Sequence, residues 1–260
     1  MPRKSGRRTR KAGSTRKSRG STSRRKKWSL DMDTVVPEVA RRVIERLGLD
    51  YAGVSVEDIR DLIEEIVQAI AENRATKPSI DSLVRNIVRN GPALKKAVAA
   101  ILAQREDLTG EQIDFIIASA PEVAGRVAPR LYTIARKKGM DHVVDALRTL
   151  WVTYGRPTPF TCPRCGFRAL TPDLTCMVCG ASVDEYEFKE SIGFEDLLEE
   201  MARERPSDAL QAAEAGFVLY DGNQLLPPSA RVPGKPYMEL YLTGREREIL
   251  RRAATRAVRG

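Results

Sequence analysis

The sequence predicts a mainly α-helical protein with a small cysteine-rich module, a small α+β region after it, and a disordered basic arm at the amino end. Three observations predict this. Apolar residues recur at spacings of three and four over 29–156. All four cysteines lie within 162–179, in two CxxC pairs. Residues 1–27 hold 13 of the 44 basic residues and none of the 35 acidic ones.

The chain is therefore expected to have four parts. Residues 1–28 form the arm, 29–156 a domain of about seven helices, 157–183 the cysteine-rich module, and 184–260 an α+β region with a hairpin and a final basic helix. The first and third parts carry the candidate binding residues.

The arm consists almost entirely of Arg, Lys, Ser, Thr and Gly. Such a segment cannot bury enough apolar surface to offset the entropy lost on ordering, so we expect it to be disordered. Because the arm holds 13 cations and no acid, the rest of the chain has 31 basic and 35 acidic residues, a net charge of −4 against +9 for the whole chain. This division is typical of a nucleic-acid-binding arm on a globular body.

The 13 cations of the arm are candidate contacts to nucleic-acid phosphates. They predict affinity without sequence specificity, because no base-reading pattern accompanies them. The alternative is a tail that only solubilises or localises the protein. No membrane role is expected, since no apolar run approaches the roughly 18 residues of a membrane span. The candidate nucleic-acid-binding residues are Arg3, Lys4, Arg7, Arg8, Arg10, Lys11, Arg16, Lys17, Arg19, Arg24, Arg25, Lys26 and Lys27.

The first two predicted helices have clear start and stop signals. An apolar stripe over 36–47 ends at Gly48, a residue that commonly stops a helix. Ser55 and Asp58 are spaced as a capping box in front of a second stripe over 59–70. Both segments therefore predict amphipathic helices that bury one face.

Five more helices are predicted before the module. The third has its stripe over 80–88, and Pro92 can open the fourth. Thr109 caps a short fifth helix, one continuous sixth helix covers 123–134, and Asp141 caps the seventh. Short connections between these segments indicate a helical bundle or an irregular helical domain, and a short α-solenoid is the alternative.

The four cysteines read Cys162-Pro-Arg-Cys165-Gly and Cys176-Met-Val-Cys179-Gly. Each CxxC pair can form a tight turn that presents two thiolates to one ion, and the glycine after it permits the turn backbone. Four sulfur ligands suit tetrahedral zinc. With four protein ligands no coordination position stays open for substrate, so we expect one structural Zn²⁺.

The Cys-Pro-Arg-Cys-Gly sequence resembles the knuckle of zinc-ribbon or rubredoxin-like modules, over about residues 160–183. The resemblance implies a place among the archaeal and eukaryotic ribosomal, transcription and RNA-processing proteins in which such ribbons are common. Disulfides and rubredoxin-type iron are the alternatives to zinc. No signal peptide precedes the body, so we expect a reducing compartment, which disfavours disulfides.

Residues 184–204 hold nine acidic residues and two basic ones, and their apolar spacing predicts a helix. A second helix over 208–215 ends before a hairpin, whose strands over 217–220 and 224–226 flank the turn dipeptide Asp221-Gly222. A third strand follows over 237–242.

Thr243 and Glu246 form a capping box for the last helix. Arg245, Arg252, Arg256 and Arg259 share one face of that helix and are a candidate second basic face. A solvated helix surface explains the same residues equally well, because Arg near a carboxyl end also suits the helix dipole.

Nothing in the sequence indicates an enzyme. A phosphate loop, a GxGxxG segment and an HExxH motif are all missing, and the one histidine, His142, is expected on the surface. The sequence therefore favours a non-enzymatic, zinc-binding, RNA- or ribosome-associated cytoplasmic protein whose arm contacts rRNA phosphates. The first alternative is a DNA-associated transcription adaptor or chromatin factor in the nucleoid. The second is a protein-interaction scaffold.

A protein partner is also expected, through the body or through the acidic segment 184–204. Four Asn and five Gln in 260 residues, beside abundant Arg, are typical of a heat-adapted source, and the ribbon suggests an archaeon.

Overall fold

The computed structural model describes residues 28–259, and the side chains of residues 28–257. The thirteen candidate nucleic-acid-binding cations of the arm, and the disorder expected there, lie outside the described residues. The side chain of Arg259 lies outside them too.

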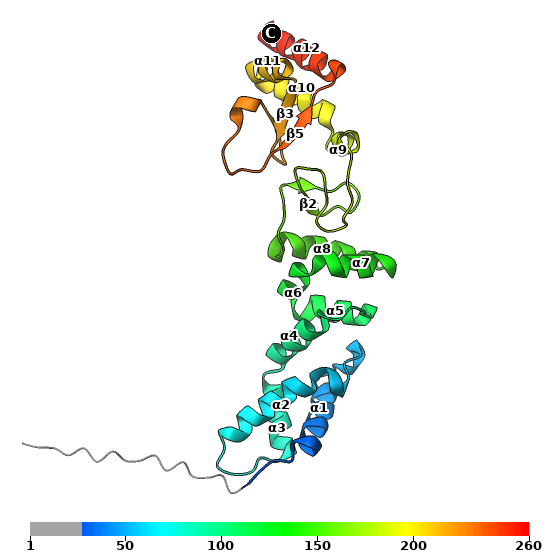
Figure 1. The fold of residues 1–260 in the computed structure, drawn as a ribbon, viewed down its shortest axis with the longest axis vertical. Helices are drawn as coiled ribbons and strands as arrows, with labels where there is room; N and C mark the ends of the chain where they lie inside the picture. The colour runs from blue at the N-terminus through cyan, green and yellow to red at the C-terminus, as the bar shows by residue number, and fades with distance from the viewer. Residues whose placement is uncertain (1–27, 260) are drawn as a thin grey trace, which may run out of the picture.

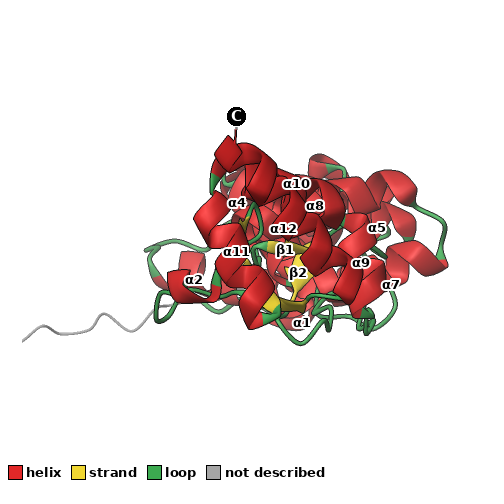
Figure 2. Ribbon diagram, turned by 90° about the horizontal axis from the view of Figure 1, so that it is seen from above, coloured by secondary structure: helices red, strands yellow, loops and turns green. Residues whose placement is uncertain are grey.

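The described chain is mainly α-helical, as predicted, with twelve α-helices and five short strands between residues 28 and 259. The helices form an elongated column, with α1 near one end and α12 at the other (Figure 1). Seen from above, helices from both halves of the chain overlie one another (Figure 2). Over the first eight helices, contacts join mainly elements that are close in sequence, as in a short solenoid, whereas the last helix packs on helices that precede the carboxyl-terminal strands.

The lower layer of the column holds α1 (Met32–Leu47), α2 (Val56–Glu72) and α3 (Ile80–Arg89), with a 3-10 turn at Asp50–Ala52. Helix α1 packs on α2 and α3. The predicted signals are confirmed. Gly48 ends α1 with a φ of 63°, and the Ser55 and Asp58 capping box opens α2.

The next layers hold α4 (Gly91–Leu102), α5 (Gly110–Ser119), α6 (Pro121–Arg126), α7 (Ala128–Lys137) and α8 (Asp141–Tyr154). Each of these helices contacts the next along the column.

Two details of the prediction for these helices were wrong. The expected single sixth helix over 123–134 is divided into α6 and α7 at Val127. The cause is Pro129, which has no N–H to donate and whose ring would clash with the carbonyl of Gly125 in a continuous helix. In addition, the cap position of α8 is Met140, and Asp141 is the first helical residue.

The cysteine-rich module follows α8 and contains β1 (Phe160–Thr161) and β2 (Arg168–Leu170), which pair antiparallel. Strand β2 contacts α8. The module thus continues the column directly above the last helix of the helical domain (Figure 1).

The carboxyl-terminal region contains α9 (Glu185–Ser191), α10 (Phe194–Glu204), α11 (Pro206–Ala215) and α12 (Gly244–Arg259). Its sheet has the order β4-β3-β5 and is antiparallel throughout. The strands are β3 (Phe217–Tyr220), β4 (Leu225–Leu226) and β5 (Met238–Tyr241), with a 3-10 turn at Pro228–Ala230. The hairpin, the third strand and the last helix are confirmed, whereas α9 was not predicted.

A single connected core of buried side chains extends from α1 to α12. Among its fully buried members are Ile63, Leu147, Phe160 and Leu250, one from each level of the column. In the described part of the chain, none of the helices combines the length and the apolar character that a bilayer crossing requires.

Candidate metal centre

Both CxxC turns have the same backbone geometry. In the first, the Cys162 N–H donates to Phe167 O at 2.9 Å, and the Gly166 N–H donates to Cys162 O at 2.8 Å. The second turn repeats both bonds at 2.9 Å, from Cys176 to Ala181 and from the glycine at 180 to Cys176. The two glycines have φ angles of 75° and 69°, a conformation that favours glycine, as the spacing predicted.

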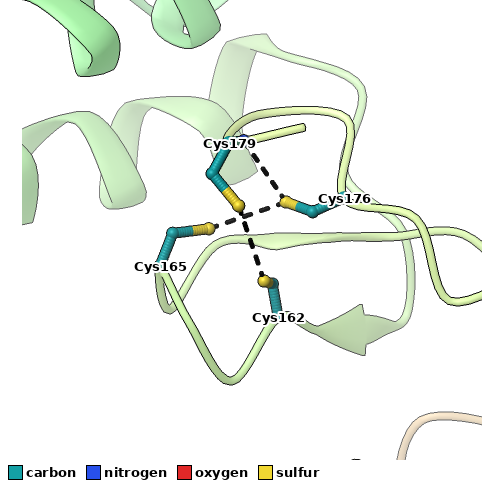
Figure 3. Close-up of side chains that lie close together, drawn as sticks. All are labelled: Cys162, Cys165, Cys176 and Cys179. Carbon is teal, nitrogen blue, oxygen red and sulfur yellow. Dashed lines mark hydrogen bonds between the residues drawn. The ribbon is translucent and has the colours of Figure 1, made fainter. Parts of the chain in front are cut away.

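The two turns bring the four sulfur atoms together, and in Figure 3 all four point toward one centre. The Sγ atoms of Cys162 and Cys179 are 3.9 Å apart, and those of Cys165 and Cys176 are 3.6 Å apart. All four ligand atoms lie within 4.8 Å of one another. A tetrahedral ion with metal–sulfur bonds of about 2.3 Å requires sulfur separations of about 3.8 Å, so the cluster is positioned to bind a metal ion.

The environment of the thiols is that of a closed site. Cys162, Cys165 and Cys176 are buried, and Cys179 is half-buried. Burial raises the pKa of Cys162, and the hydrogen bond to Cys176 together with burial raises the pKa of Cys165. The hydrogen bond from Cys165, with the backbone N–H groups of Val178 and Cys179, lowers the pKa of Cys176. A cation at the centre would replace the protons that Cys162 and Cys165 otherwise retain.

The helical domain holds the module through α7 and α8. Trp151 Nε1 donates to Arg168 O at 2.9 Å, and Arg148 Nε donates to Cys165 O at 2.9 Å. The ring of Tyr132 meets the buried Phe167 edge to face, with centroids 5.3 Å apart. One first-turn ligand is therefore joined to α8 by its own backbone carbonyl.

The carboxyl-terminal region holds the opposite side of the module. Arg164, within the first CxxC turn, makes a bidentate ion pair with Glu187 of α9, at 3.1 and 2.9 Å. Phe160 of β1 and Phe188 of α9 both contact the ring of Tyr220, at centroid distances of 6.0 and 5.9 Å. The metal centre thus lies at the junction of the two halves of the column.

The candidate second basic face lies partly in ion pairs. Arg245 is 3.2 Å from Glu195, and Arg252 is 2.6 Å from Glu248. Arg256 is exposed and lines a shallow groove on α12 with Arg252. The structure therefore places three of these four arginines on the surface of α12, and some of their charge is neutralised within the chain.

The acidic segment 184–204 forms α9 and α10. Glu187 and Glu195 pair with Arg164 and Arg245. Sequence reasoning did not single out Lys189, which is buried and pairs with Glu185 and Glu246 at 3.2 Å each. The only sequence signal for it is that Lys189 is one of two bases in a segment of nine acids. Among the described residues, Glu199, Glu200 and Glu204 are exposed and make no ion pair.

His142 is exposed, and its Nε2 atom lies 3.6 Å from Asp114. No family model, no curated protein and no solved structure matches this chain. Fold and site together define a mainly helical protein with four cysteines positioned to bind a metal ion, an arrangement that is consistent with a zinc-ribbon-like knuckle.

Proposed function

We propose that the chain is a non-enzymatic, RNA-associated protein, stabilised by zinc, whose arm contacts the phosphates of structured RNA such as rRNA. The observation that carries the proposal is the charge division, with 13 cations in residues 1–27 and a net charge of −4 over the rest of the chain. An unopposed cation run of this density neutralises phosphates and releases their counterions.

Zinc is the ion that this donor set favours. Four thiolates select zinc or iron, and a closed four-sulfur site leaves no position for catalysis. The test is metal analysis of freshly purified, reduced protein. About one equivalent of zinc per chain supports the assignment. An equivalent of iron with a visible absorption band would replace zinc, and no bound metal would contradict the site.

The folded body anchors the residue that follows the arm, which supports the interpretation that the arm tethers the body to RNA. Trp28, the first described residue, donates from Nε1 to Ala75 O at 3.0 Å, in the loop between α2 and α3. Several acids of the body pair with bases of the same chain, which neutralises part of the basic charge outside the arm.

The test compares the full-length chain with a variant that lacks residues 1–27, using fluorescence anisotropy with structured rRNA fragments and with duplex DNA. The full-length chain should bind RNA, and affinity should fall by roughly 10³–10⁵ between about 50 and 200 mM salt if 6–10 phosphates are neutralised. The truncated variant should lose most of the binding. Preference for duplex DNA would favour a transcription adaptor or chromatin factor instead. If the full-length chain binds neither nucleic acid at low salt, the protein-interaction scaffold becomes the favoured function.

A further inference from the structure

An open groove of about 710 Å³ lies between α2, α3 and α4, at the end of the column where the arm begins. Its floor is aliphatic, with Ile66 and Ile70 half-buried and Leu94 buried. A groove of this size is within the range of small-ligand sites.

The polar residues of the groove are unusual for this chain. Only four Asn occur in 260 residues, and three of them, Asn73, Asn86 and Asn90, line this one groove. Two bond their own helices, from Asn73 Nδ2 to Ala69 O and from Asn86 Nδ2 to Ser82 O. Within residues 28–259 the Oδ1 atoms of Asn73 and Asn86, and both polar atoms of the Asn90 side chain, have no hydrogen-bond partner. The groove therefore offers carboxamide groups to a ligand.

The charge of the groove is positive. Arg74 and Arg89 line it, and no carboxylate does. Neither arginine has an ion-pair partner among the described residues, although Arg74 donates to Ser82 Oγ at 3.2 Å. The next residue after Arg74 is Ala75, the one that holds Trp28. Trp28, the residue that directly follows the 13 cations of the arm in sequence, is thus held next to this groove.

We propose that the groove binds one unstacked nucleotide of the RNA strand that the arm holds, an inference that rests on the proposed function. The aliphatic floor takes the flat base, and the Asn carboxamides bond the edge of the ring, as Asn does with purines. The arginines meet the flanking phosphates. An amphipathic helix of a partner protein would use the same floor, but it would gain little from three carboxamides. The arm supplies affinity, and the groove supplies a base preference that the arm lacks.

The test measures binding of fluorescein-labelled A, U and C homopolymers of about twelve nucleotides to the full-length chain. The wild-type protein should favour one homopolymer over the others by about tenfold. Two groove variants should lose this preference. One replaces the two carboxamides, Asn86→Ala with Asn90→Ala, and the other fills the groove from an exposed position, Ala93→Trp. Both should keep the salt dependence, because no phosphate contact is removed.

The matched control is Asn223→Ala, which removes the fourth Asn, in the β3–β4 turn far from the groove. This variant should keep the preference. Deleting residues 1–27 should instead lower the affinity for all three homopolymers alike and reduce the salt dependence of binding. Equal binding of the three homopolymers by the wild-type protein, or a preference that persists in Ala93→Trp, would overturn the groove assignment while leaving the arm intact. Absence of RNA binding by the full-length chain would overturn the proposed function itself.

Discussion

At Gly166 the metal-binding turn lies close against Arg148 of α8. A Cβ atom at this position would lie 2.8 Å from Nε of Arg148, the same atom that donates to Cys165 O. Gly180 occupies the equivalent position of the second turn, with a similar φ, yet a Cβ atom there would meet nothing within 4 Å. Both positions therefore impose the same backbone strain on a substituted residue, but only position 166 adds a clash with α8.

Replacing each glycine by alanine should therefore give unequal losses. Gly180→Ala should lower the free energy of unfolding by about 1 kcal/mol, the cost of a left-handed alanine. Gly166→Ala should cost about 1 kcal/mol more, because Arg148 must move and its bond to Cys165 O is lost. Urea unfolding of the metal-loaded variants measures the difference. Equal losses would show that Arg148 does not fix the turn.

The ligands were predictable from the sequence, but their surroundings were not. Cys162, Cys165 and their second-turn counterparts follow from spacing, because two residues between cysteines form the turn that a metal requires. The bond from Trp151 to Arg168 O joins residues 17 positions apart, and it depends on how α8 packs against β2. No local pattern encodes such a contact.

At the scale of the element, side chains cap both edges of the three-stranded sheet. On β5, the Tyr241 N–H donates to Glu185 Oε1 at 2.8 Å, and Tyr241 O accepts from Lys189 Nζ. On β4, Leu225 O accepts from Arg205 at 2.9 Å. Exposed strand edges otherwise invite pairing with another chain. The buried Lys189 therefore closes an edge and also joins α9 to α12 through Glu246.

Lys189→Met should destabilise the fold and open this edge. The change leaves Glu246, whose side chain is only 12% exposed, without its cation, and we expect a loss of about 2–4 kcal/mol in the free energy of unfolding. Adding Glu246→Gln should recover part of the loss, because it removes the unpaired charge. Chemical unfolding and sedimentation velocity measure stability and self-association. If the double variant is no more stable than Lys189→Met, the ion pair between Lys189 and Glu246 does not account for the loss.

The β3–β4 turn depends on an ionised aspartate. Burial alone would raise the pKa of Asp221, but hydrogen bonds from the backbone N–H groups of Gln224 and Asn223 and from Lys235 lower it below its usual range. Its contribution is therefore fully present above the unfolded-state pKa, about 3.9, and is lost as pH falls through the lower folded-state value.

Asp221→Asn should destabilise the protein by about 1–2 kcal/mol at neutral pH, since the ion pair and the charged acceptor are removed. The difference from wild type should stay constant from about pH 6 down to about pH 5 and shrink as pH falls below about 4, because the unfolded chain then takes up a proton on Asp221 before the folded chain does. Unfolding free energies across this range provide the measurement. A difference that stays constant with pH would mean that the charge of Asp221 contributes nothing.

The elements predicted from the sequence were those with long apolar stripes and clear caps. The division between α6 and α7 was missed although Pro129 marks it, because the stripe continues in phase across the break. Helix α9 was missed because seven residues with one fully buried apolar side chain, Phe188, make no periodic pattern. The one local signal for α9 is its cap, in which the Asp184 side chain accepts a hydrogen bond from the Glu187 N–H.

At the scale of the molecule, the cysteine-rich module lies between two halves of the column and joins their cores. Contacts run from α8 to β2 on one side, and the elements after the module pack chiefly on one another. The first turn binds both sides, through Cys165 O to Arg148 and through Arg164 to Glu187. Metal binding should therefore set the orientation of the two halves.

Removing the metal should uncouple them. A strong chelator under reducing conditions should convert one thermal unfolding transition into two, one for each half of the column. In a Trp28→Phe variant, Trp151 is the one remaining tryptophan, and its emission should shift as its bond to Arg168 O is lost. Readdition of zinc should restore both signals. A single transition and an unchanged emission in metal-free protein would contradict this role.

The order of contacts along the column also bears on how the chain acquires its structure. Over α1 to α8, elements that touch are mostly neighbours in sequence, so folding of this half closes mainly short loops, which favours fast folding. Helices α1 to α8 have nearly all their packing partners before residue 157 is synthesised, so this half can fold while the cysteines are still to be added. The metal-binding turns would then assemble on a finished α8, and the carboxyl-terminal half would fold last, against a surface already in place.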